Sequence, residues 1–120
     1  MRNIKLQRCQ SGNINDCFDF NIVSGQNGKG IYSFFYNDFP MVKYYSKNGE
    51  KLYTFEIDNK YIKDLSKKNI DYWDIQSFIY NNPEFKAFIF KHSGFGIPTS
   101  KEILITDEKI IKNIKYESNT

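Results

Sequence analysis

The chain has 120 residues, enough for one domain with a modest core and too few for two. Hydrophobic residues make up 40% and charged residues 26%, as in ordinary globular domains, but aromatic residues reach 18%, so we expect a core built largely from rings. The net charge of +3 is spread along the chain without a basic block, which argues against a nucleic-acid ligand. No apolar run approaches the roughly 20 residues of a membrane span.

Cysteine and histidine are scarce. Two cysteines, Cys9 and Cys17, do not make a disulfide framework, and a single histidine leaves no Cys/His zinc constellation. The opening residues, MRNIKLQRCQSGN, lack the apolar stretch of a signal peptide. We therefore expect a protein that acts in the cytoplasm, in a reducing environment, without a metal ion and without a membrane partner.

Three segments of the N-terminal half have the alternating or aromatic pattern of strands: residues 3–9, 30–36 and 51–57. The third follows the turn KNGE, residues 47–50. Between the first two, residues 11–29 predict a long polar loop with three apolar side chains as anchors: Phe18, Phe20 and Ile22. Loops of this length in a small domain are often functional.

A short helix is predicted near residues 38–46. Asn37 or Asp38 can cap its first turn, in which Pro40 is tolerated. One face of this helix carries three large side chains: Met41, Tyr44 and Tyr45. We expect this face to pack against the sheet.

A second helix is predicted near residues 71–81, with Asp71 as its cap and Asn81-Asn82-Pro83 as its end. Four more segments have strand patterns: residues 61–65, 85–91, 101–106 and 109–116, the last after a turn at Asp107-Glu108. Strands therefore outweigh helices. We predict an α+β domain of two small packed sheets flanked by the two helices.

The order of these elements resembles the ADP-ribosyltransferase superfamily. GKGIYSFF and MVKYYSKNGEKLYTFEID, within residues 28–58, resemble the family's Gly-x-Gly-Ile-Tyr strand, tyrosine-bearing helix and following strand. KEILITDEKIIKNIKY, residues 101–116, resembles its closing strand, turn and strand, and NIKLQRCQS, residues 3–11, is a weaker match to its first strand. The resemblance implies one ADP-ribosyltransferase-like domain over residues 1–120, a split β-sheet sandwich with two or three small flanking helices.

The resemblance also implies a reaction, the transfer of ADP-ribose from NAD to a target protein. Breaking the bond between nicotinamide and ribose passes through a cation-like sugar, which a nearby carboxylate stabilises. Glu102 begins an apolar strand where the family places its catalytic glutamate, so Glu102 is the predicted catalytic residue. Apart from the resemblance, it reads as a solvent-side strand glutamate.

The NAD-binding residues that the resemblance implies are Arg8, Gln10, Gly30, Tyr32, Ser33 and Tyr44. Arg8 would meet the pyrophosphate or the adenosine ribose, since a guanidinium pairs two oxygens at once. Gly30 would let the backbone approach the nicotinamide amide, and Tyr32 and Tyr44 would form its two walls. Gln10, with Ser11, would assist at the ribose hydroxyls. The alternative is that the tyrosines are core rings and Arg8 an exposed strand arginine.

The chain departs from the family pattern at three places, one of which is that the serine strand motif of the arginine-modifying members is missing, although Ser33 follows Tyr32. Arginine-modifying members carry Glu or Gln two residues before the catalytic glutamate, where this chain has Ser100, and the polymerase-like branch has His where this chain has Arg8. The sequence therefore combines signatures of two branches, and arginine is disfavoured as the modified residue.

The small size resembles a phage-encoded effector or a stripped toxin domain. Such an effector would modify a bacterial host or competitor protein, for example as an inhibitor of a defence system such as an anti-CRISPR protein. The alternative function is a non-catalytic protein of the same fold that blocks a partner through an aromatic contact patch. NAD binding separates the two hypotheses.

Overall fold

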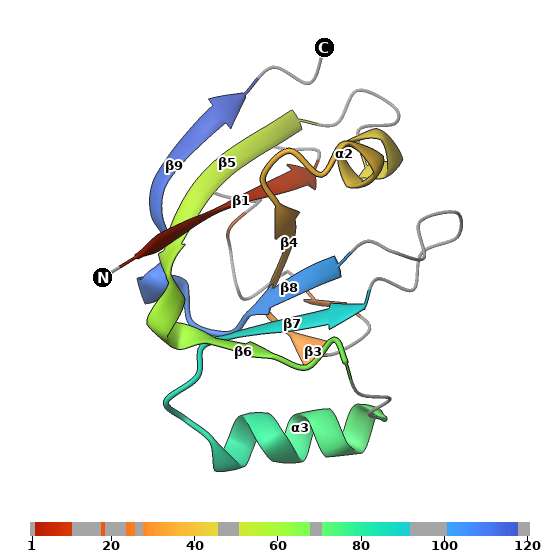
Figure 1. The fold of residues 1–120 in the computed structure, drawn as a ribbon, viewed down its shortest axis with the longest axis vertical. Coiled ribbons are helices and arrows are strands. Elements are labelled where there is room, and N and C mark those ends of the chain that lie inside the picture. The colour runs from red at the N-terminus through yellow and green to blue at the C-terminus, as the bar shows by residue number, and fades with distance from the viewer. Residues whose placement is uncertain are drawn as a thin grey trace.

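Strands dominate the part of the chain that the computed structural model describes, namely residues 2–10, 18, 24–25, 28–45, 51–67, 71–91 and 101–117. Seven strands form one sheet in the order β6-β7-β8-β4-β1-β5-β9 (Figure 1). Their bounds are β1 Asn3–Gln10, β4 Ile31–Phe35, β5 Lys51–Asp58, β6 Ile62–Asp64, β7 Ala87–Lys91, β8 Lys101–Ile105 and β9 Lys112–Glu117. All neighbours are antiparallel except β6 and β7. The predicted α+β class is confirmed.

Strand β4 joins two groups of strands, β6-β7-β8 and β1-β5-β9, in a single sheet. Its first residues, Ile31–Ser33, pair with β8, and its last two, Phe34 and Phe35, pair with β1. The prediction of two separate sheets therefore needs correction, because one five-residue strand is shared between them. Pairing between β1 and β4 involves only Gln7 and Leu6 on the β1 side, so the contact between the two halves is narrow.

The predicted loop 11–29 contains a short ladder. Strand β2, Ser24–Gly25, pairs antiparallel with β3, Gly28–Lys29. Two-residue strands are too short to show an alternating pattern, which is why the sequence reads as loop. Of the three expected anchors, Phe18 is confirmed: its ring meets Phe55 edge-on, with centroids 5.4 Å apart. Phe20 and Ile22 lie outside the described residues.

Helix α2, Phe39–Tyr45, forms where the sequence predicts it. The backbone N–H of Met41 donates to Asp38 Oδ1 at 3.3 Å, so Asp38 is the cap. Asn37 instead takes the left-handed conformation, with φ 64°, in the turn before the helix. The expected inward face packs against β1, β4 and β5, in a cluster that includes Cys9, Phe34, Met41, Leu52, Tyr44 and Tyr45.

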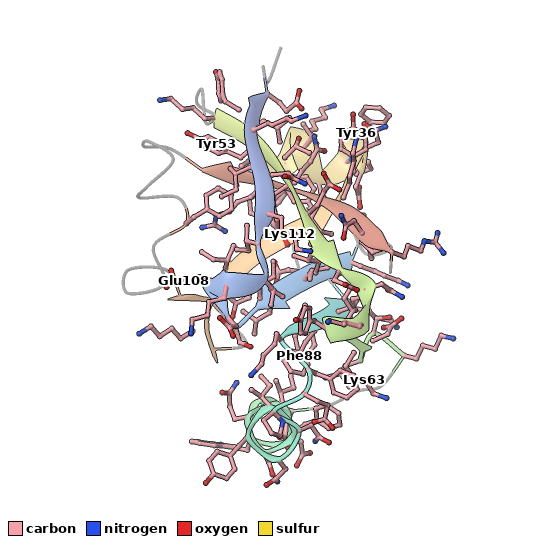
Figure 2. The ribbon with its side chains drawn as sticks, turned by 90° about the vertical axis from the view of Figure 1, so that its left-hand side faces the viewer. Tyr36, Tyr53, Lys63, Phe88, Glu108 and Lys112 are labelled. Carbon is pink, nitrogen blue, oxygen red and sulfur yellow. The ribbon has the colours of Figure 1, made fainter. Side chains whose placement is uncertain are left out.

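Helix α3, Tyr72–Asn81, is the second predicted helix. Its buried side packs against the sheet on strands β7 and β8, in a cluster that includes Leu65, Ile75, Phe78, Ile79, Phe88, Phe90 and Leu104. In Figure 2, Phe88 lies on the side of the sheet that faces this helix, and its ring meets Phe78 edge-on at 6.2 Å. None of the helices in the described ranges is both long and apolar enough to cross a bilayer.

The cap of α3 makes the first testable prediction. Asp71 Oδ1 accepts a hydrogen bond from the backbone N–H of Asp74 at 2.9 Å. Replacing Asp71 with alanine removes this acceptor, and we expect the free energy of unfolding to fall by about 1 kcal/mol in urea denaturation. Asp71→Asn keeps an acceptor oxygen and should recover most of the loss. Equal stability of the alanine variant and the parent would contradict the cap.

The last strand begins later than predicted. Asp107 Oδ1 accepts from the backbone N–H of Lys109 at 3.0 Å and starts a 3-10 turn, Glu108–Ile110, which buries Ile110. The expected strand 109–116 is corrected to Lys112–Glu117, because a side-chain hydrogen bond of this kind favours a turn over an extended chain. The predicted turn at residues 47–50 lies outside the described residues.

Candidate active site

Arg8 lies where strands β1 and β4 stop pairing. The register between them covers Leu6 and Gln7 and ends there, and the guanidinium of Arg8 donates through Nη1 to the backbone carbonyl of Tyr32. Arg8 is only 5% exposed. A buried guanidinium keeps its charge and requires acceptors, so the side chain holds the two strands together where their backbone pairing ends. Arg8 is therefore not an exposed strand arginine.

Glu102 enters the same region from β8. Its neighbour on the adjacent strand β7 is Phe90. Its Oε2 accepts a long hydrogen bond, 3.5 Å, from the hydroxyl of Tyr45. Burial raises the pKa of Glu102 above its ordinary value, and the Tyr45 hydroxyl and the positive charge of Arg8 oppose that rise. The carboxyl group is thus partly desolvated and faces a donor and a cation.

Tyr45 is the last residue of α2. Its ring lies parallel to that of Phe34, with centroids 6.1 Å apart, and meets Tyr44 edge-on at 4.9 Å. Burial, and after it the negative charge of Glu102, raises the pKa of Tyr45 well above its ordinary value. The phenol therefore stays protonated at neutral pH and acts as a donor toward Glu102.

Glu102 lies on the face of the sheet that carries both helices. Side chains alternate along a strand, so Glu102 shares the face of Leu104, which packs with α3. Phe34 belongs to the cluster under α2, which supplies Tyr45. Three elements distant in the sequence, β1, α2 and β8, thus bring Arg8, Tyr45 and Glu102 together.

Of the two tyrosines predicted to hold nicotinamide, Tyr32 and Tyr44, neither makes the hydrogen bond to Glu102. Tyr44 packs against the α2 cluster beside Tyr45, but the tyrosine that contacts Glu102 is Tyr45, which the sequence analysis did not assign to the site. Both lie on the helix face of Met41, at three and four residues' distance, so the helical pattern does not separate them. The one local signal that could distinguish Tyr44 from Tyr45 is the direction of helical side chains, which point back toward the N-terminal turn.

Tyr32 is half-buried, and its ring packs against the cluster beneath α3. Its hydroxyl donates to the carbonyl of Gly28 at 2.5 Å, which ties β4 to β3. Gly30 precedes β4 with φ 150°, and a Cβ there would lie 2.4 Å from the carbonyl oxygen of Ile105. The close approach between β4 and β8 therefore requires a glycine at position 30.

Two further predicted residues stand apart from this group. Ser33 is 3% exposed, and its hydroxyl donates to the carbonyl of Ile103 at 3.1 Å, so it serves the pairing of β4 with β8. Gln10 pairs through its backbone with Lys51, and its side chain lies outside the described residues, as do Ser11 and Ser100.

Comparison of the chain with protein-family models, with curated proteins and with solved structures finds no match.

Proposed function

We propose that the protein is an NAD-dependent ADP-ribosyltransferase that modifies a bacterial host or competitor protein, with a fold of the split-sheet ADP-ribosyltransferase type. The observation that carries the proposal is the partly desolvated carboxylate of Glu102, which faces the Tyr45 hydroxyl and the charge of Arg8. Perturbed carboxyl groups of this kind occur often at active sites. The narrow junction at β4, with strands grouped on each side, supports the fold.

The transfer needs a carboxylate at the nicotinamide ribose. The bond between ribose C1 and the pyridinium nitrogen breaks, and its electron pair neutralises the nicotinamide ring. The acceptor atom of the target bonds to C1 and releases its proton. Glu102 in its ionised form would stabilise the positive charge that develops on the sugar and orient a ribose hydroxyl.

The neighbours of Glu102 have complementary roles in this proposal. Tyr45 is a positioning residue, because its hydroxyl bonds the carboxylate and its ring, with that of Tyr44, offers flat apolar surface for nicotinamide. Arg8 supplies a positive charge for the pyrophosphate and holds the carbonyl of Tyr32. Ser33, whose hydroxyl is buried in the β4–β8 pairing, has no part in it.

The direct experiment incubates the purified protein with NAD labelled in the adenylate part and a bacterial lysate. We expect one labelled protein band, together with a rise in melting temperature when NAD alone is added. A protein that neither binds nor consumes NAD would support the alternative, a non-catalytic blocker of a partner.

Replacing Tyr45 with phenylalanine tests its positioning role. The ring stays, so NAD affinity should change less than about threefold, but the hydroxyl that lowers the pKa of Glu102 is lost. The pKa of Glu102 should then rise further, and the acidic limb of the kcat profile should move to higher pH, because the reaction requires the ionised carboxylate. Tyr44→Phe is the matched control and should leave that limb in place. An unmoved limb in Tyr45→Phe would contradict the contact.

A further inference from the structure

The outward side of α3 carries exposed aromatic rings. Trp73 is 76% exposed and Tyr80 85% exposed, and together with Ser77 they follow the i, i+4, i+7 spacing of one helical stripe, opposite the buried Ile75. With the exposed Asp74 beside this stripe, these residues make up what we call the α3 outer face. Figure 1 shows the helix at one end of the molecule, with one side turned away from the sheet. Trp and Tyr are the residue types most enriched at the centres of protein interfaces.

The charged side chains of helix α3 itself, and of its cap Asp71, have one sign. Asp71, Asp74 and Glu84 are exposed along and beyond the helix, and the helix contains no Lys or Arg. The whole chain, by contrast, has a net charge of +3. Two copies meeting through this face would bring like charges together, and a phosphate backbone would be repelled. The complementary surface is a protein with basic residues around an apolar centre.

The position of α3 links this face to Glu102. The helix packs on Phe90 and Leu104, and Glu102 pairs with Phe90 and lies two residues before Leu104, on the same face of the sheet. The side chain of Gln76 lies against Gly28, whose carbonyl accepts the Tyr32 hydroxyl. A protein seated on α3 is therefore on the side of the sheet that carries the proposed active site.

We propose that the α3 outer face is the docking surface for the target protein, and that the target presents basic residues to it. This inference rests on the proposed function. It separates two tasks within the chain: Glu102 and its neighbours act on NAD, whereas Trp73 and Tyr80 select the acceptor. Removing the rings should therefore impair modification of the target without impairing the reaction with NAD alone.

The experiment measures two activities of the full chain. The first is transfer of label from NAD to the lysate protein at low target concentration. The second is NAD consumption without lysate, in which water replaces the target as the acceptor at ribose C1 and nicotinamide is released. In the double variant Trp73→Ala, Tyr80→Ala we expect protein labelling to fall roughly tenfold or more and NAD consumption to stay within twofold. Asp74→Lys should act in the same direction. The ring variants should melt within about 3 °C of the parent, because these side chains are exposed.

Tyr116→Ala is the matched control. Tyr116 is a 61% exposed aromatic residue on β9, away from α3, and its loss should change neither activity. If NAD is consumed and the α3 variants label the target as fast as the parent, the docking surface is wrong while the proposed function stands. If the parent does not consume NAD or label any protein, the proposed function itself fails.

Trp73 provides a second readout that does not depend on catalysis, because it is the single tryptophan of the chain. Poly-L-lysine, the basic probe, should shift the fluorescence of Trp73, and added salt should reduce this shift. Poly-L-glutamate and duplex DNA should cause no shift, and Asp74→Lys should weaken the shift that poly-L-lysine causes. Absence of a shift, an equal shift with the acidic polymer, or self-association through α3 in sedimentation would overturn the inference.

Discussion

Replacing Glu102 with glutamine is expected to lower the turnover of ADP-ribose transfer by on the order of a hundredfold or more, with a much smaller effect on NAD binding. Glutamine keeps the shape of the side chain and an acceptor oxygen for the Tyr45 hydroxyl, which lies 3.5 Å from Glu102 Oε2. It lacks the negative charge that the proposed cation-like transition state requires. The loss should therefore appear in kcat rather than in the dissociation constant of NAD.

The same substitution should not destabilise the protein at neutral pH. Burial raises the folded-state pKa of Glu102, so the folded protein binds a proton there more tightly than the unfolded chain does. Stability from this group is therefore greatest below the unfolded pKa and falls as the pH rises through the folded pKa. Above that range the ionised carboxylate opposes folding, and a neutral glutamine removes this cost. We expect the melting temperature at pH 7 to be equal to or higher than that of the parent.

Glu108→Gln is the control for this experiment. Glu108 is exposed in the turn before β9, at the left of Figure 2. Its replacement by glutamine changes the net charge by the same amount as Glu102→Gln. Transfer lost in Glu102→Gln alone, with the fold retained, supports catalysis. Loss of folding and NAD binding together would assign Glu102 a structural role, and unchanged biological activity in Glu102→Gln would favour the non-catalytic blocker.

Local signals predicted the helices well. The caps Asp38 and Asp71 and the apolar spacing after them act over a few residues, so the sequence places α2 and α3 almost to the residue. In the pairing of β4 with β1 and β8, the partner residues lie 27 (Gln7 and Phe34) to 74 (Ile31 and Ile105) residues apart in the sequence, and no local pattern encodes this pairing. For that reason the sequence suggested two small packed sheets, whereas the structure joins seven strands in one sheet and, of the described strands, leaves only β2 and β3 in a second, two-stranded sheet.

The candidate site was only partly accessible from the sequence. Arg8 and Glu102 were named through a family resemblance, whereas the place of Tyr45, whose hydroxyl contacts Glu102, depends on how α2 packs on Phe34. Periodicity assigns a side chain to a face of a helix, but tertiary packing decides which residue of another element that side chain contacts. Ser33 is the opposite case, a residue that the sequence assigned to the site and that the structure does not place there. Its hydroxyl is buried in the β4–β8 pairing, which the strand pattern does not reveal.

Replacing Gly30 with alanine is expected to lower the free energy of unfolding by about 3 kcal/mol or more. The backbone at Gly30 has φ 150°, which L-residues rarely adopt, and the added Cβ would lie 2.4 Å from the carbonyl oxygen of Ile105 and 2.7 Å from Leu104 Cδ1. The carbonyl belongs to the backbone of β8 and cannot rotate away. Relief would require β4 and β8 to separate, which disturbs the strand pairing beside Tyr32 and, through it, the acceptor of the Arg8 guanidinium.

Gly28→Ala is the matched control for the Gly30 prediction, because it shares the backbone strain but not the backbone clash. Gly28 has φ 111°, and its added Cβ would meet the end of the Gln76 side chain, 2.8 Å from Nε2, which can turn aside. We expect it to cost about 1–2 kcal/mol, so urea denaturation should rank the parent above Gly28→Ala and Gly28→Ala above Gly30→Ala. Equal stability of the two variants would mean that β4 and β8 do not approach as closely as the structure has them, and that Gly30 is free to serve a ligand instead.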